Sequence, residues 1–201
     1  FVVVDGGSNA DSDILYRTMK IMNEREDGKI VVAAWILTHA HGDHYDAAAI
    51  KALAPKTLIT TAEVAEKEPT AKVMRNGESL TIDGWLKVEA VAAHNTEARS
   101  NFPPKGRDNG YVLTIGGERI YIAGDTELTP EMKALKDIDI AFLPVNQPYT
   151  MTVDQAVEAI KAIRPRIFYP YHYGEVDEVT DIERLKRELS DVTDVRVFPM
   201  E

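Results

Sequence analysis

The stretch Thr38-His39-Ala40-His41-Gly42-Asp43-His44 contains three of the five histidines of this chain. It directly follows an apolar run that we interpret as a buried strand. Side chains two residues apart in an extended segment point to the same side, so His39 and His41 can reach one metal ion. If the chain then turns into a helix, Asp43 and His44 swing away and can bind a neighbouring ion. The stretch therefore predicts a metal centre that takes up to two ions.

Three further candidate ligands each follow a predicted strand: His94, Asp125 and His172. Loops at one end of a sheet are where convergent functional groups belong. Taken singly, each histidine is better explained as an ordinary surface or core residue, and Asp125 as a turn residue. Taken with the histidine stretch, ligation is favoured for all three. The chain has no cysteine, so histidine and carboxylate are the strong ligands available.

The composition indicates a globular protein, and we expect one domain over residues 1–201. Hydrophobic residues make up 44% and charged residues 28% of the chain. The formal charge is -10, which gives no broad attraction to nucleic-acid phosphates or anionic membranes. The longest apolar run, residues 30–37, falls far short of the roughly 20 residues that span a bilayer. We predict a cytoplasmic protein with a small-molecule substrate, no long nucleic-acid partner, no membrane and no predictable oligomeric state.

Short β-rich runs alternate with amphipathic helical stretches, the pattern of a layered α/β or αββα protein. Thr152 with Gln155, and Thr180 with Glu183, match the capping box that begins a helix. Gly116-Gly117 between two strand-like runs indicates a hairpin. We expect helices at residues 12–24, 46–54, 130–135, 153–163 and 182–189, and strands at residues 1–4, 30–37, 57–61, 79–82, 86–92, 110–115, 118–123, 138–145, 166–170 and 195–198.

His39-Ala40-His41-Gly42-Asp43-His44 matches the His-x-His-x-Asp-His motif of the metallo-β-lactamase fold superfamily. His94, Gly124-Asp125-Thr126 and His172 fall in the order and approximate spacing of its later motifs. The chain therefore resembles this superfamily over residues 1–172, which implies an α/β fold of the αββα sandwich type. Residues 109–173 look most like the ascorbate-6-phosphate lactonase-like metal-dependent hydrolases, in pieces such as Phe142-Leu143-Pro144-Val145.

The resemblance implies a set of seven ligands and a hydrolytic activity. A hydroxide bridging two metal ions would attack an ester, lactone or amide carbonyl. Zinc suits the imidazole-rich set, and manganese or iron are the alternatives. Asp43 would also be catalytic, by orienting the nucleophile and receiving its proton. The first ion would be held by His39, His41 and His94, the second by Asp43, His44 and His172, with Asp125 bridging them.

Asp5 follows the first strand and looks like the early structural aspartate of the superfamily. The resemblance gives it a role behind the ligands, holding the metal loop, while a simple turn residue before Gly6-Gly7 explains it nearly as well. Superfamily members usually have further strands before this aspartate, whereas four residues precede it here. We therefore expect a fold shortened at the N-terminus, through truncation or engineering.

Six polar residues are candidate substrate contacts. A local basic set in the loop after His94 could bind a phosphate or carboxylate, or it could be a solvated charged loop. A second set follows a strand that should end near the metals, and a turn around Pro148 is its competing explanation. The basic candidates are Arg99, Lys105 and Arg107, and the others are Asn146, Gln147 and Tyr149.

Three alternatives to carbonyl hydrolysis remain open. The same metal pair would serve a phosphodiesterase or nuclease, although the acidic charge weighs against a long nucleic acid. An iron-dependent redox enzyme is a second alternative, but the diiron oxygen-reducing branch typically has Glu where this chain has His41. The third is an engineered metal-binding scaffold with low activity.

Overall fold

The computed structural model describes residues 1–5, 31–96, 104–173 and 179–198. Two compact units make up the chain, Phe1–Met74 (unit 1) and Arg75–Glu201 (unit 2). The helix expected at residues 12–24 lies outside the described residues. The single domain expected over residues 1–201 stays a prediction.

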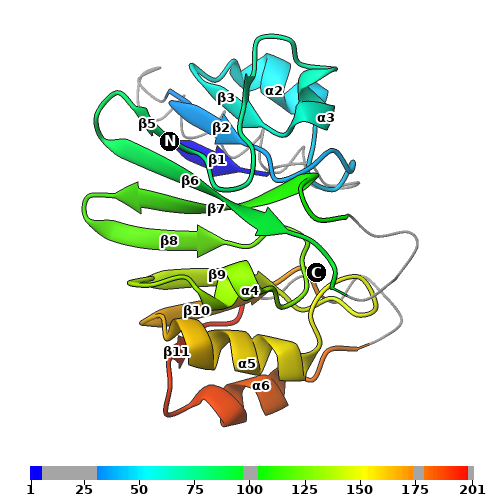
Figure 1. The fold of residues 1–201 in the computed structure, drawn as a ribbon, viewed down its shortest axis with the longest axis vertical. Helices are drawn as coiled ribbons and strands as arrows, with labels where there is room; N and C mark the ends of the chain where they lie inside the picture. Colours follow the sequence, from blue (N-terminus) through cyan, green and yellow to red (C-terminus); the bar gives the residue numbers. More distant parts are fainter. Residues whose placement is uncertain (6–30, 97–103, 174–178, 199–201) are drawn as a thin grey trace. The chain divides into compact units, whose positions relative to one another are not determined.

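Unit 1 contains a four-stranded parallel sheet with the strand order β1-β2-β3-β4 (Figure 1). Its strands are β1 (Val2–Val4), β2 (Ala34–Ile36), β3 (Leu58–Thr60) and β4 (Lys72–Val73). Every neighbouring pair in this sheet runs parallel, so the carboxyl ends of all four strands lie at one edge. Asp5 and the histidine stretch follow β1 and β2, and therefore both belong to that edge.

Helix α2 (Ala47–Leu53) begins directly after the histidine stretch. The Asp46 side chain caps it by accepting hydrogen bonds from the amides of Ala48 at 2.8 Å and Ala49 at 3.0 Å. Ile50 faces inward and packs with Trp35 and the other buried residues of unit 1. The helix expected at residues 46–54 is thus confirmed, with Asp46 as its cap.

Unit 2 contains a seven-stranded sheet with the order β11-β10-β9-β8-β7-β6-β5. Strands β5 to β8 form an antiparallel meander, and β8 to β11 run parallel. As a result β6, β8, β9 and β10 all point the same way and end at one edge. The strands are β5 (Ser79–Ile82), β6 (Leu86–Ala93), β7 (Asp108–Ile115), β8 (Glu118–Ile122), β9 (Ile140–Pro144), β10 (Ile167–Tyr171) and β11 (Asp194–Val195).

Two glycine positions shape the meander. The predicted hairpin between β7 and β8 is confirmed, with Gly116 at φ 59° and Gly117 at φ 92°, values that suit glycine. At Gly110, a Cβ atom would lie 2.5 Å from the backbone oxygen of Ala123. Only glycine therefore lets β7 approach the chain that leads to Asp125.

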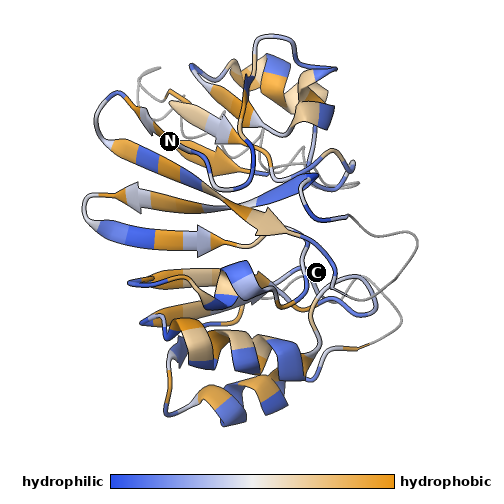
Figure 2. Ribbon diagram, viewed as in Figure 1, coloured by the Kyte–Doolittle hydropathy of each residue, from blue (hydrophilic) through white to orange (hydrophobic). Residues whose placement is uncertain are grey.

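Helices α4 (Pro130–Lys133), α5 (Val153–Ile163) and α6 (Ile182–Leu189) belong to unit 2. In β8 hydrophilic residues come first and hydrophobic residues lie in the second half of the strand (Figure 2), and Tyr121 is its one buried residue. Ile160 of α5 and Leu185 of α6 are fully buried and pack in one core with Phe168 of β10. This core supports the strands whose ends carry the candidate ligands.

One of the two predicted capping boxes is confirmed and the other is wrong. Thr152 and Gln155 exchange both hydrogen bonds at the start of α5, at 3.0 and 3.1 Å. At α6 the cap is Asp181, which accepts from the Arg184 amide at 2.8 Å. Thr180 instead donates its hydroxyl to the Val145 carbonyl, a contact between segments far apart in the sequence.

Most of the expected elements are present, and two short ones were not predicted. Helix α3 (Ala62–Ala65) is a single turn and β4 is two exposed residues, so neither carries a periodic pattern. The strand at residues 79–82 and the helices at residues 153–163 and 182–189 match to the residue. Within the described part of the chain, no helix is both long and apolar enough to cross a membrane.

Candidate metal centre

His39 has the hydrogen-bond arrangement of a prepared ligand. The Thr38 hydroxyl donates to Asp5 Oδ2 at 2.8 Å, and its oxygen lies 3.0 Å from His39 Nδ1. Because the hydroxyl hydrogen is already used, this oxygen accepts from the Nδ1–H group of His39. The Nε2 atom of His39 is then unprotonated, which is the state that binds a metal.

His39 Nε2 lies 3.0 Å from His41 Nδ1. Two nitrogens that bind one zinc ion at 2.0–2.1 Å are roughly 3.0–3.4 Å apart, so this separation fits a shared ion. One ligand atom each of His39, His41 and Asp43 lie within 4.8 Å of one another. The convergence comes from a loop, because β2 already ends at Ile36.

His44 is buried and is held from behind by Asp5. Its Nδ1 atom lies 2.8 Å from Asp5 Oδ2, and an ionised carboxylate only accepts, so Nδ1 carries the proton. Asp5 also accepts from the Thr38 amide at 2.8 Å. Its backbone has a φ of 48°, an uncommon conformation for a residue other than glycine. The position that was expected to hold the metal loop therefore contacts both Thr38 and His44.

In unit 2 the backbone of His94, directly after β6, is tied to the loop after β8. The His94 amide donates to Thr126 Oγ1 at 3.0 Å, and the Glu127 amide donates to the His94 carbonyl at 3.2 Å. The ring Nδ1 lies 3.3 Å from the Asn95 carbonyl and so donates to it. This leaves Nε2 buried, with no hydrogen-bond partner among the described residues.

Glu131 of α4 lies beside the candidate ligand His94, a contact that the sequence did not predict. Its Oε2 atom lies 3.7 Å from His94 Nε2, while its other oxygen accepts from Lys105. The Lys105 hydrogen bond, more than any other cause, holds the pKa of Glu131 below its ordinary value. In the sequence Glu131 is only an acidic residue in the first turn of a helix, which carries no signal of a site.

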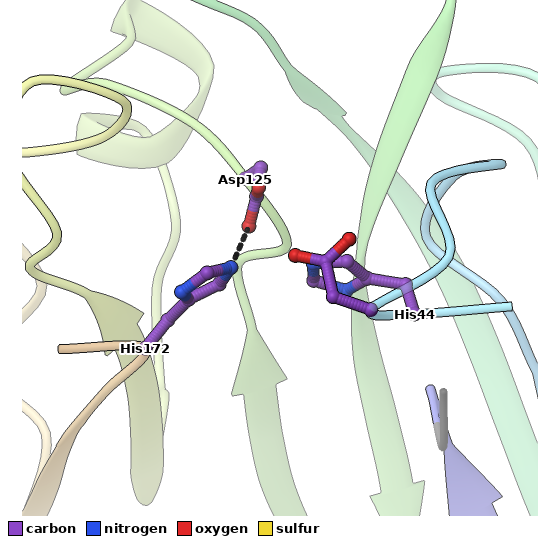
Figure 3. A group of neighbouring side chains, drawn as sticks. His44, Asp125 and His172 are labelled. Carbon is purple, nitrogen blue, oxygen red and sulfur yellow. Dashed lines mark ion pairs between the residues drawn. The ribbon is translucent and has the colours of Figure 1, made fainter. Parts of the chain in front are cut away.

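Asp125 and His172 come together in the same unit. Figure 3 shows the imidazole of His172 directed at the Asp125 carboxylate, with Nε2 3.6 Å from Oδ1. His172 has a φ of 54°, and such strained backbone is typical of functional sites. The hydroxyl of Tyr171 donates to the Gly124 carbonyl at 3.1 Å, which joins the end of β10 to the loop that carries Asp125.

The candidate substrate contacts are mostly engaged within the protein. Arg107 is bidentate to Asp108, at 3.0 and 2.9 Å. Gln147 donates to the Thr150 carbonyl at 2.6 Å, and Tyr149 is half-exposed. Their roles in binding stay predictions, and Arg99 lies outside the described residues. Lys105 pairs with Glu131, and Asn146 is buried against His172.

Comparison with known proteins identifies related chains. A family model for the beta-lactamase superfamily domain matches residues 22–173. The UPF0173 metal-dependent hydrolase of Deinococcus radiodurans is 35% identical over 155 residues, which cover 74% of this chain and 68% of that protein. A crystal structure from Parabacteroides distasonis, described as a candidate metal-dependent hydrolase, aligns with a TM-score of 0.78 and 48% identity, covering 85% of this chain and 78% of that chain. The metallo hydrolase Igni18 of Ignicoccus hospitalis aligns with a TM-score of 0.68 and 25% identity, covering 82% and 75%.

Proposed function

This chain belongs to the beta-lactamase superfamily and is a metal-dependent hydrolase, and on that premise we propose that it uses two metal ions to cleave an ester, lactone or amide bond. The observation that carries the proposal is the 3.0 Å approach of His39 Nε2 and His41 Nδ1, with the His39 proton held on Nδ1. This separation fits two nitrogens that share one ion.

The proposed ligand set consists of seven residues of the chain. What supports a shared set is the family match, since all seven candidates lie within residues 22–173. Zinc is the proposed metal, with manganese or iron as alternatives, because imidazole dominates the donors. The first ion would be held by His39, His41 and His94, the second by Asp43, His44 and His172, and Asp125 would lie between them.

When bound, two such ions lower the pKa of a shared water towards about 7 and polarise the scissile carbonyl. The chain itself orients the ligands: Asp5 and Thr38 hold the ring protons of His44 and His39 on Nδ1. Asp43 is partly exposed, and its Oδ2 atom lies 3.4 Å from His44 Nε2. We assign Asp43 the role of orienting the nucleophile and receiving its proton.

The substrate is proposed to be a small molecule. A formal charge of -10 disfavours a long nucleic acid. Lys105 and Arg107 already pair with Glu131 and Asp108, so an anionic group would have to compete with these carboxylates. An uncharged carbonyl compound therefore fits these two residues better than a phosphate ester. The cytoplasmic location and the likeness to lactonases stay predictions.

The test combines metal analysis with a hydrolytic panel. Metal-free protein is loaded with zinc, manganese or iron and assayed on ester, lactone, β-lactam and phosphodiester substrates. We expect two ions per chain, and a carbonyl substrate whose hydrolysis stops on chelation and returns with metal. The variants His41→Ala and His172→Ala should each lose one ion, and activity should fall by more than about 100-fold, beyond the range of changes behind the ligands.

The control is Lys51→Ala, an exposed position on α2 of unit 1, which should keep both ions and full activity. Full activity in strictly metal-free protein would falsify the proposal. A single bound ion would indicate a mononuclear hydrolase instead. Hydrolysis of the phosphodiester alone would indicate a phosphodiesterase.

A further inference from the structure

We propose that Asn146 is a positioning residue whose side-chain amide decides which ring nitrogen of His172 carries the proton. The inference rests on the proposed function, in which His172 is a ligand of the second ion. Asn146 was expected only as a substrate contact. Its buried place behind His172 suits an orienting role instead, because only 3% of the residue is exposed.

The backbone of Asn146 is pinned in the loop after β9. Its amide donates to Thr150 Oγ1 at 2.8 Å, and its carbonyl accepts from the amides of Tyr149 at 2.9 Å and Thr150 at 2.7 Å. These contacts fix the backbone, so the side-chain amide is the part of Asn146 that can rotate. The Nδ2 atom lies 3.1 Å from His172 Nδ1, whereas Oδ1 is buried and has no hydrogen-bond partner among the described residues.

This orientation of the amide has a definite consequence for His172. An NH2 group only donates, so His172 Nδ1 must accept, and the ring proton then sits on Nε2. Nε2 is the atom that faces Asp125 Oδ1 at 3.6 Å. A protonated Nε2 can donate towards that carboxylate, but it has no lone pair for a metal.

Turning the amide by 180° reverses the arrangement. The oxygen and nitrogen of an amide have nearly the same shape, so the turn changes hydrogen bonding far more than packing. Asn146 Oδ1 would then accept from the Nδ1–H group of His172, and Nε2 would be unprotonated. An ion bound at Nε2 requires this second orientation, and we infer that the Asn146 amide turns when the second ion binds.

The neighbouring case of His44 shows what is special about Asn146. The Asp5 carboxylate behind His44 accepts and never donates, so it holds the proton on Nδ1 in either state. The amide behind His172 can do both. His44 is therefore prepared in advance, while His172 becomes a ligand only together with a rotation of Asn146.

The experiment compares the wild-type chain with two variants. In Asn146→Asp the side chain can only accept hydrogen bonds, and in Asn146→Leu it can neither donate nor accept them. Nitrogen chemical shifts of the His172 ring report its protonated atom in metal-free and zinc-loaded protein. Competition with a chelator gives the affinity of the second zinc site. In wild type the proton should move from Nε2 to Nδ1 on zinc loading, and in Asn146→Asp it should stay on Nδ1 throughout.

For Asn146→Asp we expect a second-site affinity equal to or above that of wild type. For Asn146→Leu we expect a loss of about 10–100-fold, the usual effect of removing a group behind a ligand. Gln155→Glu is the control for added charge in unit 2, because it keeps the acceptor for the Thr152 amide, and it should leave the His172 proton as in wild type. Thermal unfolding of each variant shows whether it is folded.

An Nε2-protonated His172 in zinc-loaded wild type would overturn the inference, and so would an affinity of Asn146→Asp as low as that of Asn146→Leu. If Asn146→Leu does not fold, the ring-proton measurements on the other two proteins decide alone. Absence of zinc binding in wild type would contradict the proposed function. The ring proton of metal-free Asn146→Asp would still decide whether Asn146 controls the tautomer.

Discussion

The two units position their candidate ligands in opposite ways. Unit 1 places four of them in one loop, residues 39–44, held to Asp5 at the end of the neighbouring strand. In unit 2 each candidate ligand lies in a different loop, after β6, β8 or β10. The candidate ligands of a contiguous loop need one neighbouring strand to hold them, whereas scattered candidates depend on the register of a whole sheet.

Both arrangements use the same property of strands. In unit 1 the parallel pairing of β1 and β2 brings Asp5 beside Thr38. In unit 2 the strands that lead to the candidate ligands point the same way, although β7 between β6 and β8 runs in reverse. Carboxyl ends at a shared edge are a common place for ligand sites in α/β sheets. The two units differ in how many strands must be paired in the correct register. In unit 1 the pairing of β1 with β2 is enough, whereas in unit 2 all the strands from β6 to β10 are involved.

The largest effect that would sharpen this comparison is expected from Asp5→Asn. An amide has one accepting oxygen, so a donor of Thr38 or His44 loses its acceptor whichever way the amide lies. We expect metal affinity in unit 1 to fall by about 10–100-fold. The free energy of unfolding should fall by about 1–3 kcal/mol. Chelator competition and chemical denaturation measure the two quantities.

The control for Asp5→Asn is Asp83→Asn, an exposed aspartate whose φ of 47° matches the 48° of Asp5. It should change neither quantity, because the backbone conformation is kept and no metal loop is attached. Unchanged metal affinity in Asp5→Asn would contradict the view that unit 1 is prepared through Asp5.

A smaller effect is expected in unit 2 from Thr126→Val. The fully buried Thr126 hydroxyl accepts from the His94 amide, and valine would leave that amide without its acceptor. We expect the free energy of unfolding to fall by about 1–3 kcal/mol, with a weaker effect on metal affinity than Asp5→Asn. Chemical denaturation and chelator competition are again the measurements.

Thr114→Val is the matched control, because the buried Thr114 hydroxyl has no hydrogen-bond partner among the described residues. It should be neutral or slightly stabilising. Equal losses in Thr126→Val and Thr114→Val would show that the tie between Thr126 and His94 adds nothing to unit 2.

The smallest effect is expected from Tyr45→Phe in unit 1. The Tyr45 hydroxyl donates to Glu68 at 2.9 Å, and its loss should lower the free energy of unfolding by about 0.5–1.5 kcal/mol at neutral pH. Burial, followed by the bond to Glu68, raises the pKa of Tyr45 from 10.0 to about 12. The stabilisation linked to this shift is complete below pH 10.0 and is lost as the pH rises through about 12.

Denaturation at several alkaline pH values measures this dependence. Tyr45→Phe should lose less stability between pH 10.0 and about 12 than wild type does. Glu68→Gln is the control, since it keeps an acceptor for the hydroxyl but removes the charge, and it should lower the pKa of Tyr45 without a large loss at neutral pH. An identical alkaline profile for Tyr45→Phe and wild type would refute the assignment to Tyr45.

Prediction from sequence succeeded where local signals were sufficient. The α5 helix has an apolar stripe and a capping box, and its bounds were predicted to the residue. The metallo-β-lactamase fold, predicted from the histidine motif, is confirmed by the family match. The failures have long-range causes: Thr180 donates to Val145 rather than capping α6, and β4 exists only through its pairing with β3.

The sequence by itself determined the chemical class of this protein. Imidazole and carboxylate groups at positions 39, 41, 43 and 44, without any cysteine, predict a metal centre, and the motif that they form resembles that of the metallo-β-lactamase fold superfamily. Only the tertiary structure decided which groups contact the candidate ligands: Asp5 behind His44, Asn146 behind His172 and Glu131 beside His94. The reason is physical, because ligand spacing along a loop is set by neighbouring bonds, whereas these partners are brought together by the pairing of distant strands.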